Sequence, residues 1–255
     1  MHMPAQSGST AVLQRMRRLH TREAYIELAD KIRDRVPGVS LSSDFIAGFC
    51  GETEQDHQDT LDLMKYVKYE QAFMFAYSMR ERTHAAYKLE DDVPHEVKQR
   101  RLREIIDTFN ENALIQNVEE KNKRHVVLVE GNAKRSDPDT PMLTGRTDNN
   151  KRVVFPLKPV AASYKKYRQW ELAGYDEQME APFVEIRCGD YIIVDIDEIG
   201  VKTLKGTPLA CTSMQESSDL LQSGGGYFRS ATSDDMEYQG MALESPPRSE
   251  CSATI

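Results

Sequence analysis

Apolar side chains recur along the first 120 residues at the two spacings that helices and strands require. Apolar residues three and four positions apart predict amphipathic helices, whereas short continuous apolar runs predict buried strands. The pattern predicts helices over residues 9–17, 21–36, 54–67 and 94–119 and strands over residues 39–48 and 71–77. Strands that alternate with helices are typical of βαβ units, so we expect a parallel sheet in this part of the chain.

Local signals mark where several of these helices begin and end. Pro37 and Gly38 stop the helix over residues 21–36. Thr53, with Asp56 three positions later, resembles a capping box for the following helix. Pro94 suits the first turn of the long helix. The apolar face of the helix over residues 21–36 is predicted to consist of Tyr25, Ile26, Leu28, Ala29 and Ile32.

The pattern changes after residue 122. Short runs rich in branched side chains predict strands over residues 125–131, 152–155 and 191–196, with turns at residues 148–150 and 205–206. This succession is typical of a small antiparallel barrel over residues 123–212, which a polar helical insertion over residues 157–181 interrupts. Residues 213–255 are rich in Ser, Gly, Asp and Glu, and we expect them to be disordered. The fold class is therefore α/β followed by β.

Composition narrows the class of protein. Hydrophobic residues make up 39% of the chain, which allows a packed core over most of its 255 residues. The net charge is −8 and no basic run is present, so any RNA contact has to come from a local patch. The four cysteines form no C-x-x-C pair, which argues against a disulfide framework or a zinc site and favours a reduced, intracellular protein. No apolar run is long enough to span a bilayer, and no targeting segment comes first.

Polar residues that follow the predicted strands are candidates for a binding site, because ligands bind beyond the carboxyl ends of parallel strands. Gln6 and Ser7 lie in a turn of small residues that a ligand can approach closely. Asp44 stands in an otherwise apolar strand, and Glu52 follows a turn that contains two glycines. Arg80 ends the next strand, where it can pair with a carboxylate or phosphate. Each residue also has a structural explanation: helix capping at the turns, and simple solvent exposure for Arg80.

The predicted barrel carries basic side chains that can line an RNA-facing surface. They are Lys134, Arg135, Arg146, Lys151, Arg152, Lys202 and Lys205. An ordinary surface of mixed charge is the alternative, because residues 123–212 hold 14 basic against 13 acidic side chains. The six histidines show no metal-ligand spacing, and a small buried side chain is the favoured role for Cys50.

Four segments, taken in order, resemble the MiaB-type tRNA methylthiotransferases, a family of radical-SAM enzymes. The segments are His2-Met-Pro-Ala-Gln-Ser-Gly-Ser9, Ser43-Asp-Phe-Ile-Ala-Gly-Phe-Cys-Gly-Glu-Thr53, Phe75-Ala-Tyr-Ser-Met-Arg80 and Thr144-Gly-Arg-Thr-Asp-Asn-Asn150. Cys50 and Met79 stand where the family's elements have proline. The resemblance covers about residues 1–212 and is most like the animal mitochondrial branch. That branch is named as an associated protein of a cyclin-dependent kinase regulatory subunit.

The resemblance implies a fold and a function. Residues 1–90 correspond to the C-terminal half of a radical-SAM (βα) partial TIM barrel, residues 91–122 to a connecting helix, and residues 123–212 to a TRAM β-barrel that binds RNA. The family methylthiolates N6-isopentenyladenosine next to the anticodon of tRNA, with S-adenosylmethionine and [4Fe–4S] clusters as cofactors. By this resemblance the cofactor-binding residues are Gln6, Ser7, Asp44, Glu52 and Arg80. Asn149 joins the basic residues of the barrel on the tRNA side, and the mitochondrion is the implied compartment.

The sequence also departs from the family. The family's C-x-x-x-C-x-x-C triad, which holds the catalytic cluster, lies upstream of the Gln6-Ser-Gly8 element, and none of the four cysteines here has that spacing. We therefore expect no cluster ligands and no methylthiolation by this chain alone. A tRNA-binding fragment without catalysis, or a fragment that binds a kinase activator, are the alternative functions.

Overall fold

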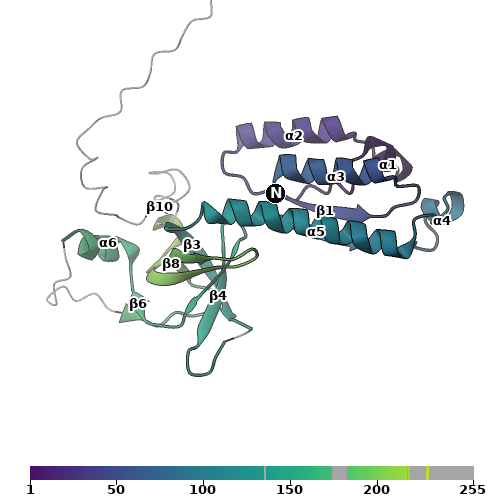
Figure 1. The fold of residues 1–255 in the computed structure, drawn as a ribbon. Helices are drawn as coiled ribbons and strands as arrows, with labels where there is room; N and C mark the ends of the chain where they lie inside the picture. The colour runs from purple at the N-terminus through teal and green to yellow at the C-terminus, as the bar shows by residue number, and fades with distance from the viewer. Residues whose placement is uncertain (135, 174–182, 217, 219–227, 230–255) are drawn as a thin grey trace, which may run out of the picture.

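The computed structural model describes residues 1–134, 136–173, 183–216, 218 and 228–229. Figure 1 shows helices and parallel strands along one part of the long helix α5 and a group of mostly antiparallel strands near its C-terminal end. The helices are α1 (Thr10–Arg15), α2 (Arg22–Arg35), α3 (Glu54–Val67), α4 (His84–Lys88), α5 (His95–Val118) and α6 (Tyr164–Ala173). The strands are β1 (Ser42–Ala47), β2 (Gln71–Ala76), β3 (Lys123–Asn132), β4 (Met142–Thr147), β5 (Arg152–Pro156), β6 (Val160–Ala161), β7 (Phe183–Val184), β8 (Tyr191–Ile199), β9 (Leu204–Thr212) and β10 (Phe228–Arg229).

The first part of the chain contains the parallel arrangement that the sequence predicts. β1 and β2 run parallel and pair along their whole length. Residues 1–6 extend this ladder on the other side of β1. The Gln6 N–H donates to the Asp44 carbonyl at 2.9 Å, and the Gln6 carbonyl accepts from the Ile46 N–H at 3.0 Å. The carboxyl ends of all three segments therefore lie at the same edge of the sheet.

One face of this sheet is packed and the other is open. Phe45 of β1 belongs to a buried cluster with side chains of α2, α3 and α5. On the opposite face, Phe73 and Phe75 of β2 are 45% and 56% exposed, and they pair in register with Asp44 and Ile46 of β1. We call these four residues the open face. Its two phenylalanine rings are thus about half exposed, and no described helix packs over this face.

The predicted helices before residue 120 are present as α1, α2, α3 and α5, whereas α4 was not predicted. The capping box at α3 is confirmed, because the Thr53 side chain accepts from the Asp56 N–H while the Asp56 carboxylate accepts from the Thr53 N–H. On α2, Tyr25 and Ala29 are buried, but Leu28 is 50% exposed. The prediction for Leu28 was wrong because residue 28 lies beside the stripe of apolar positions that faces the sheet.

Five strands close into a barrel. β3 pairs with β4 and β8, β4 with β5, and β9 with both β5 and β8, so the order returns to its starting strand. The predicted antiparallel pairing holds for four of these pairs, but β5 and β9 are parallel. The parallel pair arises because β9, the last of the five strands, closes the ring against the third.

The predicted turn at residues 205–206 was wrong. Lys205 and Gly206 lie inside β9, opposite Glu198 and Ile196 of β8. Gly206 serves close strand packing instead: a Cβ atom there would lie 2.1 Å from the Asp195 carbonyl oxygen. The glycine is required because β8 and β9 approach too closely for any side chain.

The predicted insertion and tail are described only in part. α6 supplies the expected helix within residues 157–181, whereas Val160 and Ala161 form β6 and pair with β9 and β7. Residues 174–181 lie outside the described residues. In the tail that was expected to be disordered, β10 pairs with β3, which the composition did not predict. Within the described ranges, no helix is long and apolar enough to cross a membrane.

Candidate cofactor pocket and nucleic-acid interface

A pocket of about 230 Å³ opens where residues 1–6, β1 and β2 end. Gln6 and Arg80, two of the predicted cofactor-binding residues, line it together with Ile46, Phe49 and Tyr77. Gln6 has a positive φ of 69°, which turns the chain at the edge of the sheet. Its side-chain amide and the Arg80 guanidinium form no hydrogen bond with any described residue, so both are free to meet a ligand. The volume of this pocket is somewhat below the range of about 300–1,000 Å³ that small-molecule pockets usually span.

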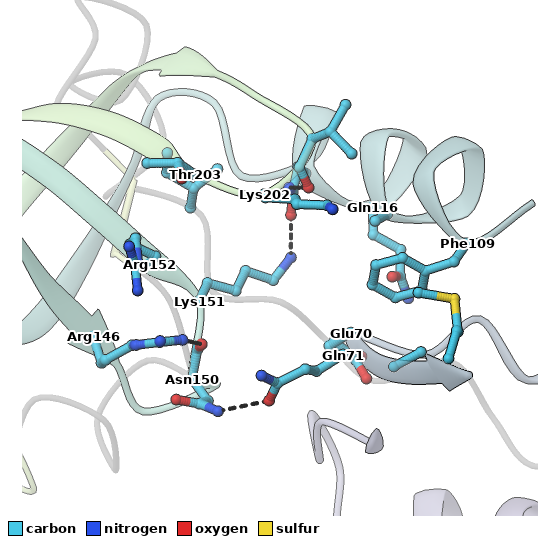
Figure 2. A pocket seen from close by; sticks show the side chains of 16 residues that line it. Glu70, Gln71, Phe109, Gln116, Arg146, Asn150, Lys151, Arg152, Lys202 and Thr203 are labelled. Atoms are coloured by element: carbon cyan, nitrogen blue, oxygen red, sulfur yellow. Dashed lines mark hydrogen bonds between the residues drawn. The ribbon is translucent and has the colours of Figure 1, made fainter. Parts of the chain in front are cut away.

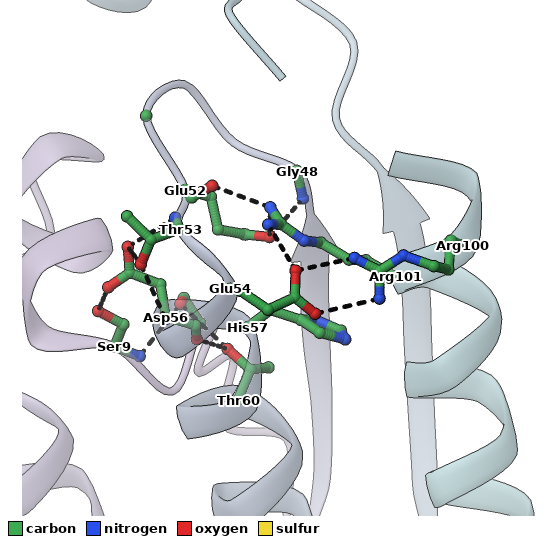
Figure 3. Close-up of polar contacts among 12 residues, drawn as sticks. Ser9, Gly48, Glu52, Thr53, Glu54, Asp56, His57, Thr60, Arg100 and Arg101 are labelled. Carbon is green, nitrogen blue, oxygen red and sulfur yellow. Dashed lines mark hydrogen bonds and ion pairs between the residues drawn. The ribbon is translucent and has the colours of Figure 1, made fainter. Parts of the chain in front are cut away.

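Ser7 lies behind this pocket and serves the turn itself. Its hydroxyl is 3.3 Å from the Thr60 hydroxyl and accepts from the Ser9 N–H at 3.2 Å. Ser9 caps α1 and donates to the Asp56 carboxylate, as Figure 3 shows. Gly8 is needed here because a Cβ atom would lie 2.3 Å from the Asp59 carbonyl oxygen of α3. The Gln-Ser-Gly element is thus a tight junction between the first strand segment and α3, with only Gln6 turned toward the pocket.

Asp44 does not line the pocket. It lies on the open face in the middle of β1, where its carboxylate is 3.5 Å from the His2 ring. His2 in turn meets the Phe73 ring edge-on, with ring centroids 6.1 Å apart. Asp44 therefore belongs to the open face and not to the pocket.

Glu52 is buried in a charged cluster beneath the pocket (Figure 3). Its carboxylate accepts from the Gly48 N–H and from the Arg101 guanidinium, each at 3.0 Å. Arg101 also donates to the Glu52 carbonyl at 2.9 Å and to Glu54 at 3.0 Å. Burial raises the pKa of Glu52, while the Gly48 amide and Arg101 oppose the rise. The cluster fixes the Gly48–Thr53 turn that borders the pocket.

The sequence analysis missed Arg101, which α5 presents to the interior. Lys98, Arg101, Ile105 and Thr108 are all buried, and their spacing of three and four residues marks one face of the helix. Two cations on such a face require internal acidic partners, and Lys98 forms an ion pair with Asp91. The periodicity was therefore a usable signal for buried ion pairs.

The residues predicted to contact RNA do not form one surface. Arg146, Lys151, Arg152 and Lys202 line a cavity between the barrel, α5 and the start of β2, as Figure 2 shows. Of the other predicted residues, Asn149 borders a neighbouring cavity, Lys134 is exposed outside both cavities, and Lys205 forms an exposed ion pair with Glu198. Arg135 lies outside the described residues.

The two candidate sites lie at opposite ends of the parallel strands. The first borders the carboxyl ends, beyond Ala47 and Ala76, whereas the basic cavity includes Gln71, where β2 begins. The basic cavity extends along β2 as far as Met74, three residues before Tyr77 of the first pocket.

Comparison with known proteins identifies the class. Residues 1–64 match the family model "Radical SAM superfamily". The chain is 46% identical over 220 residues to the human protein "Mitochondrial tRNA methylthiotransferase CDK5RAP1", covering 86% of this chain and 33% of that protein. It is 48% identical over 216 residues to the "CDK5RAP1-like protein" of Oryza sativa, covering 85% and 33%.

A bacterial relative extends the comparison. The "tRNA-2-methylthio-N(6)-dimethylallyladenosine synthase" of Flavobacterium johnsoniae is 41% identical over 214 residues, which cover 84% of this chain and 38% of that protein. The family match over residues 1–64 gives the class, a radical SAM protein. Within that superfamily the chain belongs to the MiaB-type tRNA methylthiotransferase family. The chain spans about a third of the length of the curated relatives it matches.

The two cofactors of the family fit the described residues unequally. The free Gln6 amide and the Arg80 guanidinium suit the polar groups of S-adenosylmethionine, and the flanking aromatic rings suit its base. For an iron–sulfur cluster, no three His, Cys, Asp or Glu side chains come together in the part of the chain that the structure describes. Cys50 is buried and packs against Val12 and Phe49. These residues do not fit a [4Fe–4S] cluster.

Proposed function

We propose that this chain forms the substrate-holding part of a tRNA methylthiotransferase, which modifies N6-isopentenyladenosine beside the anticodon. The observation that carries the proposal is the arrangement of a cofactor-pocket wall and a closed, RNA-binding type of barrel on one long helix. Relatives similar in sequence to this chain are named for a reaction on tRNA. The mitochondrial names of the animal relatives favour that compartment.

The finer assignments belong to the same proposal. Residues 1–90 are the C-terminal half of a partial TIM barrel. The open face supports this assignment, because in such barrels the face of the strands opposite the helices points to the interior. Residues 91–122 connect it to a TRAM barrel over residues 123–212. S-adenosylmethionine then contacts Gln6 and Arg80, while Ser7 and Glu52 position the turns behind them.

We also propose that the chain binds tRNA without methylthiolating it when no other polypeptide supplies cluster ligands. Each cysteine stands far from the next in sequence, so the chain offers no C-x-x-x-C-x-x-C element. The kinase regulatory subunit stays a prediction of the resemblance, since no contact in the described residues argues for it.

Titration of tRNA at two salt concentrations tests the proposal. We expect binding that weakens steeply with salt, because phosphate contacts release counterions. A second titration follows S-adenosylmethionine by calorimetry, in the wild type and in Arg80→Ala. Salt-insensitive or absent tRNA binding contradicts the proposed role of the barrel, and equal S-adenosylmethionine binding by both proteins contradicts the assignment of Arg80.

A further inference from the structure

The basic cavity between the barrel and α5 has a volume of about 350 Å³, which is within the usual range for a small ligand. We call it the junction pocket (Figure 2). α5 and the barrel are fastened together beside it: the Asn117 side-chain amide donates to the carbonyls of Gly200 and Val201 at 2.9 and 3.1 Å. The Asn150 amide donates to the Gln71 side-chain oxygen at 2.9 Å. The pocket is therefore built by contacts between two parts of the fold.

Different sides of the junction pocket carry different kinds of side chain. An apolar floor comes from β2 and α5, amide side chains come from both sides, and cations come from the barrel. The floor consists of Ala72, Met74, Phe109 and Ala113, the amides are Gln71, Gln116, Asn117 and Asn150, and the cations are Arg146, Lys151, Arg152 and Lys202. Glu70 is the single carboxylate among these lining residues, and it already accepts the Leu41 N–H at 2.6 Å. The excess of cations calls for an anionic ligand.

Two of the four cationic side chains already form hydrogen bonds with described residues, and two do not. Lys151 donates to the Asn117 side-chain oxygen at 2.8 Å, and burial lowers its pKa. Arg146 donates to the Asn150 carbonyl at 2.9 Å. The side chains of Arg152 and Lys202, by contrast, form no hydrogen bond or ion pair with any residue that the structure describes. A phosphate that enters the pocket can therefore bind Arg152 and Lys202 without breaking an existing contact.

The Gln71–Asn150 pair presents a matched donor and acceptor. Because the Asn150 N–H donates to the Gln71 oxygen, the Gln71 NH2 group and the Asn150 oxygen remain available. A donor beside an acceptor is the pattern that base edges recognise. The Phe109 ring and the neighbouring methyl groups give the base an apolar surface.

We propose that the junction pocket binds one unstacked nucleotide unit, with its phosphate between Arg152 and Lys202 and its base edge on the Gln71–Asn150 pair. The inference rests on the proposed function in taking an RNA strand as the source of that nucleotide. Single-stranded RNA is the form whose bases are free to leave the stack and enter such a pocket. Free nucleotides share this chemistry and are distinguished by the test.

The test measures binding of a short labelled single-stranded RNA to the full chain by fluorescence anisotropy at two salt concentrations. Arg152→Ala and Lys202→Ala should each weaken binding by about tenfold, the loss of one charge-assisted contact. Each should also reduce the salt slope by about one. Arg187→Ala is the matched control, because it removes an exposed cation near the start of β8 that lies outside the pocket, and it should weaken binding by less than about twofold. Circular dichroism checks that each variant folds. Lys202→Ala carries the lowest risk of misfolding, because Lys202 lies in an exposed turn.

Competition identifies the ligand. Adenosine 5′-monophosphate should displace the RNA at concentrations where inorganic phosphate does not, and Gln71→Ala should abolish this difference. Equal displacement by both overturns the base contact. If Arg152→Ala and Lys202→Ala behave like Arg187→Ala, the junction pocket is not the site, although RNA binding and the proposed function stand. If the wild type binds the nucleotide but no RNA, the proposed function fails instead and the source is a free nucleotide.

Discussion

Replacement of Arg101 by Met should destabilise the helical part of the protein strongly. Arg101 and Glu52 are paired at 3.0 Å, and their side chains are 5% and 2% exposed. Removal of one partner from a buried ion pair typically costs about 3–5 kcal/mol, because the remaining charge stays buried without compensation. A domain with about 5–15 kcal/mol of net stability loses a large fraction of it. At a urea dependence of about 2 kcal/mol/M, the unfolding midpoint falls by about 2 M.

The chain offers two separate probes for this experiment. Circular dichroism at the helical band follows α2, α3 and α5, which pack around the parallel strands. Fluorescence follows the single tryptophan, Trp170, which lies in α6 beside the barrel. Arg101→Met should move the circular dichroism transition further than the fluorescence transition, since the pair lies in the helical part.

The control is Lys31→Met, which breaks the exposed Lys31–Glu27 pair, with side chains 67% and 66% exposed. An exposed pair four residues apart on a helix contributes about 0.3–0.5 kcal/mol, so its transition should scarcely move. The double variant Glu52→Gln, Arg101→Met removes both charges and should recover part of the loss. The reasoning is refuted if Arg101→Met moves the circular dichroism midpoint no further than Lys31→Met does.

Two further perturbations test the acidic cluster and the barrel. Hydrogen bonds from Arg100 hold the pKa of Glu54 at about 2. The contribution of Glu54 to stability is therefore complete above the unfolded pKa of about 4.5 and is lost as the pH falls toward 2. The difference in urea midpoint between Glu54→Gln and wild type should be measurable at pH 7 and vanish near pH 2. Gly206→Ala places a methyl group against the Asp195 carbonyl and should cost about 1–3 kcal/mol or more. Its effect should appear in tryptophan fluorescence, while the neighbouring Lys205→Ala leaves that transition in place; equal effects would contradict the packing argument.

The elements of this fold were predictable where one local rule decides the structure. The capping box at Thr53 and the apolar spacing of α2 and α3 are such cases, since each helix buries one stripe. Gly206 shows the limit of local rules. A glycine beside a lysine is typical of a turn, but here β8 approaches β9 so closely that only glycine fits. Nothing within a few residues of Gly206 encodes the position of β8.

The candidate sites show the same limit for side chains. Gln6 and Arg80 were predictable because parallel strands bring their carboxyl ends together. Glu52 lies on the same turn as the pocket, yet Arg101, 49 positions later, draws it into the interior. From the sequence alone, a side chain of this loop can face either the pocket or the interior. Only the packing of α5 decides that Glu52 faces the interior.

The separation of the two sites bears on how a nucleic acid is held. The junction pocket includes Gln71, where β2 begins, whereas Arg80 lies beyond the residue where β2 ends. Under the two proposals, the nucleotide held by Arg152 and Lys202 is a different one from the nucleotide presented to the cofactor pocket. Such an anchor positions the strand and leaves selection of the modified base to the other end of the sheet. The open face, with Asp44 and two exposed phenylalanines, lies on the same strands that join these ends. Together the two proposals predict that RNA binding and S-adenosylmethionine binding are lost independently, the first by Arg152→Ala and the second by Arg80→Ala.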